Sequence, residues 1–449
     1  MSLINILIFS TISVLLGLES LKTRNYLKII GTLVLFTVSY FIIYFMVWHI
    51  NFSSLDYWKI YSLGLVIICF LVIIQFIQDK TFDVYLLNLL VLLGSLIIIL
   101  CDHLLIIYLG LELQTFSLFV LISKNRFSIK SSEAGLKYFI LGALSSGIYL
   151  LGLCFFFLSG VSLNIKDLVL VSEEILVIIG VAMILLSFAF KLALFPLHFW
   201  IPDIYEGSSW DVIGLLSTLP KISIITIILQ IGINSNLLLF CSLLSIIVGT
   251  LGALNQTKMK RLLAYSGISH MGFIMLGYNL LFLEGYEVGT FYLIIYILTM
   301  LSVFIMILSS PLQKDYYIIE LSGLQYINKT LALIWLMVFL SIAGIPPFSG
   351  FISKWFILWN ALNYGYMISA IIGIIFSAIG AAYYLRIVKI TYFQKQSSYL
   401  TWSKILNSRD KENELLLILL GLGVYIIIGL IINPSPLILI LNTIFYYFF

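Results

Sequence analysis

The sequence predicts an all-α polytopic membrane protein with about fourteen transmembrane helices. Of its 449 residues, 62% are hydrophobic and only 10% are charged, whereas a soluble domain is about 45–50% apolar and about 25% charged. The mean hydropathy is +1.15. A span of about 20 apolar residues with a short loop uses roughly 32 residues, which divides the chain into about fourteen spans. Nearly continuous apolar stretches such as 176–190 exclude the alternating pattern of a membrane β-barrel.

Apolar runs separated by polar residues place the spans in order along the chain. Pro434 and Pro436 open a short tail, 434–449, which is predicted to lie at the membrane interface, with a fifteenth short span as the alternative. The predicted spans are 3–18, 26–48, 57–77, 84–100, 104–123, 133–159, 175–197, 210–232, 235–254, 261–281, 288–311, 330–363, 365–392 and 414–432.

The basic residues support this order and orient the chain. Eighteen of the 24 lysines and arginines fall in odd-numbered loops or at the helix ends that face them, and only Lys59 and Lys166 fall on the opposite side. Because cytoplasmic or matrix loops are enriched in basic residues, both termini are predicted to face the other side. The net charge of only +4 indicates no acidic partner such as a nucleic acid.

Cysteine and glycine patterns indicate no cofactor in this chain. The four cysteines occur singly within apolar runs, so no CxxC pair suggests a metal, a haem or an iron–sulfur cluster. The sequence also has no glycine-rich phosphate loop and no large soluble segment. We therefore expect no cofactor-binding or metal-binding residues.

Once the charges near span ends are counted with the loops that they face, five charged residues remain inside the predicted spans, where lipid disfavours them. A charge at the bilayer centre costs on the order of 2.5–3.5 kcal/mol, so each must pair, contact water or change its protonation state. All three possibilities indicate an ion pathway. For Lys137 the alternative is a helix-end residue that pairs with Glu133 four positions earlier. The charged residues are Glu112, Lys137, Lys191, Lys221 and Lys354.

Two further groups of polar residues lie in or beside the predicted spans. His270 lies in a polar patch, where it serves either as a hydrogen-bonded packing residue or as a proton relay. Asp203 and Glu206 are expected to form a solvated acidic face.

Prolines inside the spans predict broken helices. Each proline leaves the carbonyl four residues before it without its intrahelical partner. Three of the four embedded lysines lie within seven residues of such a proline, which favours broken helices that line hydrated cavities. The prolines and their freed carbonyls are Pro196 with Leu192, Pro220 with Leu216, Pro346 with Ile342, and Pro347 with Ala343.

The two strongest breaks predict an internal repeat. They lie at Lys191–Pro196 in span 7 and Pro346–Lys354 in span 12, five spans apart, so a five-helix unit would recur in inverted orientation. The predicted parts are 1–80 with three N-terminal helices, 84–232 as a first repeat of helices 4–8, 235–392 as a second repeat of helices 9–13, and 393–449 with a loop, the last transmembrane helix and the tail.

Several motifs across about 101–360 resemble the antiporter-like membrane subunits of respiratory NADH:ubiquinone oxidoreductase (complex I). Two of them, EAGLKYF at 133–139 and LGALSSG at 141–147, together with Lys354, favour the N-type, or subunit 2, branch. The motifs are LGLELQ at 109–114, EAGLKYF at 133–139, LGALSSG at 141–147, FKLALFPLHFWIPD at 190–203, LPK at 219–221, RLLAYSGISHMG at 261–272 and GIPPFSGFISK at 344–354.

The resemblance implies fourteen helices, inverted repeats at helices 4–8 and 9–13, and broken helices 7 and 12. It implies a proton-translocating subunit in which Glu112 and Lys191, matching the family's helix-5 glutamate and helix-7 lysine, form a modulating ion pair. Lys221 matches the central relay lysine of helix 8, and Lys354 matches the helix-12 lysine at the exit. Lys137 and His270 occupy further positions of the polar axis and are possible relays.

The resemblance also implies a setting. The chain would belong to an H⁺-translocating NADH:ubiquinone reductase, with NADH, FMN, iron–sulfur clusters and ubiquinone bound elsewhere in the complex. Its partners would be other membrane-arm subunits, including neighbouring antiporter-like ones, and a lipid such as cardiolipin. The expected location is the mitochondrial inner membrane with both termini on the intermembrane-space side, or alternatively a bacterial plasma membrane.

Two other functions remain open at this point. The chain could be a subunit of a multisubunit cation/proton antiporter, which needs no redox partner. It could also be a structural module whose embedded charges only hold the helices together.

Overall fold

A computed structural model describes residues 54–74, 77, 81–125, 127–165, 174–232, 236–280, 282–309, 317–394 and 414–446. This part of the chain is helical and contains no β-strand, which confirms the predicted all-α class. Within it, seven helices are long and apolar enough to cross a membrane. The first two predicted spans, 3–18 and 26–48, lie outside the described residues.

Each predicted span from the third onward corresponds to a helix or to a pair of helices. The helices are α3 (Ser54–Ile74), α4 (Phe82–Leu100), α5 (Leu104–Ile122), α6 (Ile129–Ser159), α8 (Ile175–Lys191), α9 (Trp200–Gly207), α10 (Trp210–Ile231), α11 (Asn236–Leu254), α12 (Met259–Asn279), α13 (Phe282–Ser309), α14 (Leu324–Ile327), α15 (Lys329–Ala343), α16 (Ser349–Asn363), α17 (Met367–Phe393), α19 (Glu414–Ile432) and α20 (Ser435–Tyr446), with a 3-10 turn at Ile318–Leu321.

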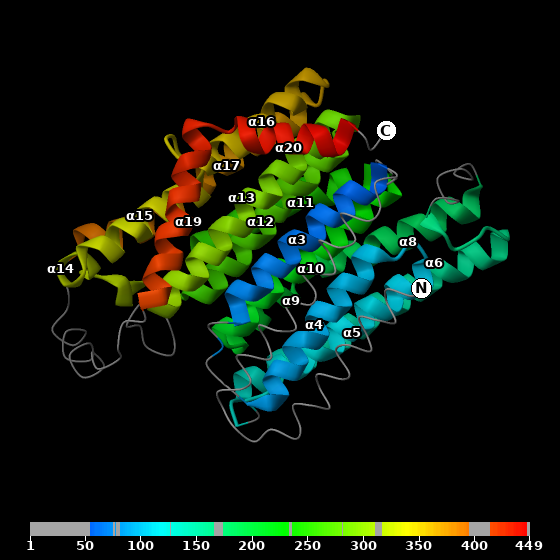
Figure 1. Ribbon diagram of the computed structural model, residues 1–449, viewed down its shortest axis with the longest axis horizontal. Coiled ribbons are helices and arrows are strands. Elements are labelled where there is room, and N and C mark those ends of the chain that lie inside the picture. The colour runs from blue at the N-terminus through cyan, green and yellow to red at the C-terminus, as the bar shows by residue number, and fades with distance from the viewer. Residues whose placement is uncertain are drawn as a thin grey trace, which may run out of the picture.

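Helix α10 is the centre of the bundle. Every one of its 22 residues is buried, and it packs against α3, α4 and α13. A helix that is apolar all round needs such complete enclosure by other helices. Figure 1 shows that the long helices of the bundle run roughly parallel to one another. A charged side chain on α10 is therefore shielded from both solvent and lipid by the surrounding helices.

Helix breaks interrupt two of the predicted spans, and the helix that follows the first break, α9, lies beyond the predicted end of its span. Span 175–197 forms α8, which ends at Lys191, and the chain is irregular through Pro196 before α9 begins. Span 330–363 forms α15 and α16, which are separated by Gly344 in the left-handed conformation (φ +78°) and by Pro346 and Pro347. The breaks thus occur at Pro196 and at Pro346–Pro347. The break expected at Pro220 is wrong, because α10 continues through this proline as one helix enclosed on all sides by its neighbours.

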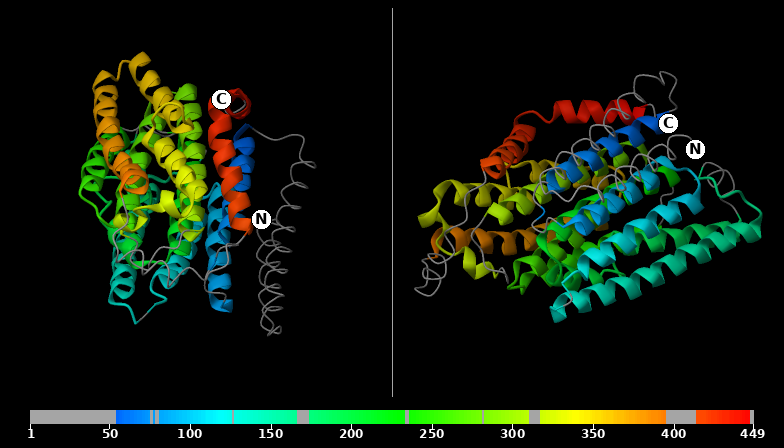
Figure 2. Two further views of the ribbon diagram at one scale, coloured as in Figure 1. Left: turned by 90° about the vertical axis from the view of Figure 1, so that its left-hand side faces the viewer. Right: turned by 60° about the horizontal axis from the view of Figure 1, so that its bottom comes forward.

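The C-terminal tail turns away from the bundle direction. Helix α20 is bent by 81° from α19. Figures 1 and 2 show it lying crosswise over one end of the bundle, and it packs against α13 and α3. Within the predicted interfacial tail, 434–449, the described residues 435–446 therefore form a helix that covers the end of the bundle where α13 begins.

The crossing of α15 and α16 leaves no room at Gly350, and this predicts a stability effect. A Cβ added at Gly350 would lie 1.7 Å from the Ser341 carbonyl oxygen, so Gly350→Ala should destabilise the fold by at least about 1–3 kcal/mol. As a control, Gly142→Ala on α6 places its Cβ more than 4 Å from any neighbour and should be neutral or stabilising. Thermal unfolding of the solubilised protein checks this, and equal unfolding temperatures for the two variants would contradict it.

Candidate functional site

Lys221 lies in the middle of α10 and is 3% exposed. Its Nζ donates a hydrogen bond to Tyr296 Oη on α13 over 2.6 Å and lies 4.8 Å from the centre of the same ring. Gly267 on α12 lies beside the amine, since an added Cβ would be in ordinary van der Waals contact with Nζ at 3.7 Å. A buried ammonium group is costly unless it is hydrogen-bonded. The Tyr296 hydroxyl and ring supply that stabilisation.

His270 on α12 continues the polar contacts from Lys221. Its Nδ1 lies 2.7 Å from Tyr292 Oη and its Nε2 lies 3.1 Å from Tyr384 Oη. Its ring also packs against the Tyr296 ring, with centres 5.6 Å apart. A hydroxyl group both donates and accepts, so either tautomer of the imidazole is satisfied here. Tyr296 therefore contacts both Lys221 and His270.

A small cavity of about 10 Å³ separates His270 from the break between α15 and α16. This is about the space that one water molecule needs. Polar side chains from α12, α13, α15 and α16 meet around it. The residues that line this central cavity are His270, Tyr292, Ile295, Tyr296, Thr299, Ser341, Ile342, Gly350 and Ser353.

Lys354 on α16 reaches back across the helix break. It is 7% exposed, and its Nζ donates to the carbonyl oxygens of Ala343 at 2.7 Å and of Ile342 at 3.4 Å. These are the two carbonyls that Pro347 and Pro346 leave without an intrahelical partner. Ile342 also lines the central cavity, so Lys354 lies next to it. The break thus solvates a lysine with main-chain oxygens.

Glu112 and Lys191 lie on α5 and α8 and are half-buried. The Glu112 carboxylate and the Lys191 amine, both in the described part of the chain, form no ion pair within 4.0 Å. Their charges still interact electrostatically. Glu112 instead accepts a hydrogen bond from the Thr115 hydroxyl over 3.4 Å, and Lys191 Nζ lies 6.0 Å from the centre of the Phe190 ring. The two groups therefore interact through their charges without forming an ion pair.

Lys137 belongs to a separate cluster of charges. It pairs with Glu133 over 2.5 Å, the i,i+4 contact expected from the sequence, and with Asp203 over 2.7 Å. Asp203 also accepts a hydrogen bond from Arg261 over 3.0 Å. The cluster therefore joins α6, α9 and α12 at the end of the broken span.

Glu206 extends this cluster on α9. It pairs with Lys258, with Arg261 over 3.4 Å and with Lys130 over 3.5 Å. The expectation of a solvated acidic face at Asp203 and Glu206 is wrong. These residues form a short helix held between basic side chains, and the Glu206 side chain is only 17% exposed.

Three tyrosines complete the site, and sequence reasoning missed them. Tyr292 and Tyr296 are four residues apart in an apolar run, so they share a face of α13, and Tyr384 lies on α17. The i,i+4 spacing was a usable signal, but 27 tyrosines in the chain obscured it.

In the described part, no three His, Cys, Asp or Glu side chains converge on a possible metal position. The amines of Lys221 and Lys354, the imidazole of His270 and the tyrosine hydroxyls between them are all groups that can donate and accept protons.

Comparisons with known proteins identify the family. The sequence profile described as "NADH:quinone oxidoreductase/Mrp antiporter, TM" matches residues 101–380. The chain belongs to this family. It is 40% identical over 359 residues to NADH-ubiquinone oxidoreductase chain 2 of Metridium senile, covering 78% of this chain and 93% of the relative. The chain is accordingly an antiporter-like membrane subunit of complex I of the subunit 2 type, as its motifs indicate.

Solved structures share the fold. A chain of respiratory complex I from Thermus thermophilus with bound aureothin matches with a TM-score of 0.78 and 26% identity, covering 94% of this chain and 97% of that one. A chain of the Mrp complex from Dietzia sp. DQ12-45-1b matches with a TM-score of 0.76 and 21% identity, covering 87% and 83%. The second likeness concerns the fold alone, so it does not favour the antiporter alternative over complex I.

The charge cluster around α9 predicts a pH-dependent contribution to stability. Burial tends to raise the pKa of Glu206, but the hydrogen bond from Lys258 and the charges of Lys258, Arg261 and Lys130 outweigh it and lower this pKa below 4.5. A lowered pKa stabilises the folded state above pH 4.5, and this contribution is lost as the pH falls through the folded-state pKa.

Glu206→Gln should therefore cost up to about 1 kcal/mol at neutral pH. The difference from the natural protein should disappear in acid. Thermal unfolding across pH checks this, with Glu174→Gln, at an exposed glutamate before α8, as the control. A difference that grows on acidification would contradict the assignment.

Proposed function

We propose that this subunit translocates protons through Lys221, His270 and Lys354, driven by electron transfer in other subunits of complex I. One observation carries the proposal. The Lys221–Tyr296 hydrogen bond, the His270–tyrosine contacts and the central cavity form a nearly continuous polar path through the buried core to Lys354. A bundle of apolar helices has no packing reason to bury two lysines and a histidine in one line.

The chemistry of each group fits this role. Lys221 is the central relay, because Tyr296 accepts a hydrogen bond from its protonated form and can return a proton to its neutral form. His270 connects the tyrosines to the central cavity, where one bridging water would extend the path. Lys354 is the exit group, held by carbonyl oxygens at the break.

Glu112 and Lys191 are proposed as the switch of the path. A carboxylate close to a lysine favours the protonated lysine, and burial favours the neutral one. The pair interacts without direct contact, so a small approach or separation of α5 and α8 would change the charge of Lys191. Lys221 would respond to that change. Lys137, tied to Asp203, is proposed as a further relay at the α9 end of the pathway.

The proposed architecture is the family's. It has fourteen transmembrane helices, with inverted repeats at 84–232 and 235–392 preceded by three helices within 1–80 and followed by 393–449. The α8–α9 and α15–α16 breaks, one in each proposed repeat, support this division.

We propose that the subunit lies in the mitochondrial inner membrane. Both termini face the intermembrane space in this proposal, because the basic residues favour the opposite set of loops. Its partners are other membrane-arm subunits, including antiporter-like neighbours, and a lipid such as cardiolipin. NADH, FMN, iron–sulfur clusters and ubiquinone belong to the rest of the complex.

The central role of Lys221 is tested by Lys221→Ala. The variant complex should pump fewer protons per electron, or oxidise NADH more slowly if the two steps are obligatorily coupled, because the path loses its relay. Proton uptake and NADH oxidation are measured in sealed vesicles, with assembly verified on a native gel. Lys389→Ala, an exposed lysine near the end of α17, serves as the control. Full pumping per electron together with an unchanged rate of NADH oxidation in Lys221→Ala would exclude the relay role.

The Tyr296 hydroxyl should matter for transfer and not only for folding. Tyr296→Phe removes the acceptor of the Lys221 hydrogen bond and should slow pumping severalfold. Tyr149→Phe is the matched control, because it removes a buried tyrosine hydroxyl that bonds the Leu104 carbonyl oxygen over 3.0 Å, away from the path. Each change should cost about 1 kcal/mol of stability. The same pumping rate in both variants would show that Tyr296 only packs.

A further inference from the structure

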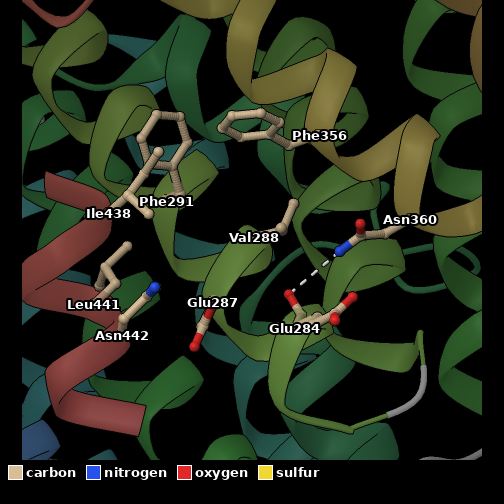
Figure 3. A pocket seen from close by; sticks show the side chains of 9 residues that line it. All are labelled: Glu284, Glu287, Val288, Phe291, Phe356, Asn360, Ile438, Leu441 and Asn442. Carbon is tan, nitrogen blue, oxygen red and sulfur yellow. Dashed lines mark hydrogen bonds between the residues drawn. The ribbon is translucent and has the colours of Figure 1, made fainter. Parts of the chain in front are cut away.

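A second and larger cavity, of about 300 Å³, lies at the end of the bundle where α13 begins. It lies between α13, α16 and the crosswise helix α20 (Figure 3). Its volume accommodates several waters. We call it the acidic vestibule, because it contains an exposed Glu284 and a half-buried Glu287. Its lining residues are Glu284, Glu287, Val288, Phe291, Phe356, Asn360, Ile438, Leu441 and Asn442.

The acidic vestibule and the central cavity lie in line along the same pair of helices. On α13, Val288 of the vestibule is followed four residues later by Tyr292 and three residues after that by Ile295, both of the central cavity. On α16, Ser353 of the central cavity is followed three residues later by Phe356 of the vestibule. Such spacings keep residues on one helix face. The α13–α16 interface therefore contains both hollows.

Two aromatic rings lie at this interface, one on each helix, where the vestibule comes nearest to the central cavity along the chain. The centres of the Phe291 and Phe356 rings are 5.5 Å apart, and their planes are tilted by 60°. Figure 3 shows both rings at one end of the vestibule and the two carboxylates at the other. Along α13 and α16, the ring end is the one that faces the central cavity. A narrow apolar constriction stops ions by excluding water, and it conducts when it is wetted.

We propose that the Phe291–Phe356 pair is a hydrophobic gate between the central cavity and the acidic vestibule, and that Glu287 receives the protons that cross it. The proposal rests on the proposed function. When the rings part and water joins the hollows, the Lys354 ammonium loses a proton to the water chain and becomes a neutral amine. Glu287 takes that proton as a carboxylic acid and then releases it to the aqueous phase. Lys354 regains a proton from the His270 side, so the charges balance over one cycle.

The gate is tested first by thiol labelling of the assembled complex. The four native cysteines are replaced by alanine, and a small charged methanethiosulfonate reagent is added from the side where α13 begins. Val288→Cys, in the vestibule, should be labelled at least about tenfold faster than Ile295→Cys, which lies about 10 Å further along α13 behind the rings. Equal rates, or no labelling of Val288→Cys, would overturn the gate.

Removal of a ring provides the second measurement. Phe356→Ala should raise the labelling of Ile295→Cys and the passive proton leak of vesicles without NADH, whereas Phe356→Leu keeps an apolar barrier and should do neither. Trp359→Ala removes an exposed aromatic side chain from the same helix and is the control. Unchanged labelling and leak in Phe356→Ala would overturn the gate. The first comparison needs no ring to be removed, so it stands even if ring variants fail to assemble.

The role of Glu287 is separated from that of its neighbour by paired variants. Glu287→Gln should lower the protons pumped per electron severalfold more than Glu284→Gln, because Glu284 is exposed and accepts a hydrogen bond from the Tyr364 hydroxyl over 2.8 Å. Equal pumping in the two variants would exclude Glu287 as the acceptor.

Loss of pumping in Lys221→Ala with failed gate tests would overturn the gate alone. Full pumping in Lys221→Ala would overturn the underlying function as well.

Discussion

The cost of burying an ammonium group in an apolar bundle is the constraint on which the structure depends. Lys221 lies on a helix with every residue buried, so lipid and bulk water are both out of its reach. The protein must provide the missing solvation, and it does so with the hydroxyl and the ring of Tyr296. A lysine held in this way is stable in the core and yet close to a group that exchanges protons. The same requirement explains why polar side chains gather at this depth of the bundle.

The broken helix between α15 and α16 meets the same requirement by another means. Prolines remove main-chain donors, which leaves carbonyl oxygens without partners inside the membrane region, and such oxygens are costly unless something binds them. Lys354 binds two of them. The lysine and the break therefore stabilise each other: the carbonyls solvate the ammonium, and the ammonium satisfies the carbonyls. At the other break, the Trp200 indole donates to the Phe190 carbonyl oxygen, and the ion pairs of Asp203 and Glu206 hold α9 in place.

Helix α13 organises the path. Tyr292 and Tyr296 contact His270 and Lys221 at the centre of the bundle, while Glu287 and Phe291 line the vestibule at its end. One helix thus connects the lysine of α10, the histidine of α12 and the two hollows at the α16 interface. Its neighbour α20 covers the vestibule. Residues of α20 therefore line the acidic vestibule together with residues of α13 and α16.

The sequence by itself determined the class of the protein and the approximate position of its helices from residue 57 onward. Lipid imposes a minimum length and a strong apolar bias on each span, and these are local properties that can be counted. The sequence also determined which charges are out of place, since Lys221 and Lys354 conflict with their apolar surroundings whatever the fold. The breaks at Pro196 and at Pro346–Pro347 followed from the prolines for the same local reason, whereas α10 continues through Pro220, so a proline alone does not decide a break.

Only the tertiary structure decided which polar groups meet. Tyr292, Tyr296 and Tyr384 come from two helices far apart in sequence, and nothing local marks them among many other tyrosines. The structure joins Lys137 to Asp203, and it leaves Glu112 and Lys191 in electrostatic interaction but outside ion-pair distance. The two cavities exist only because α13 and α16 pack side by side. Contacts of this kind depend on how helices are arranged in three dimensions, which the spacing of residues along one chain does not specify.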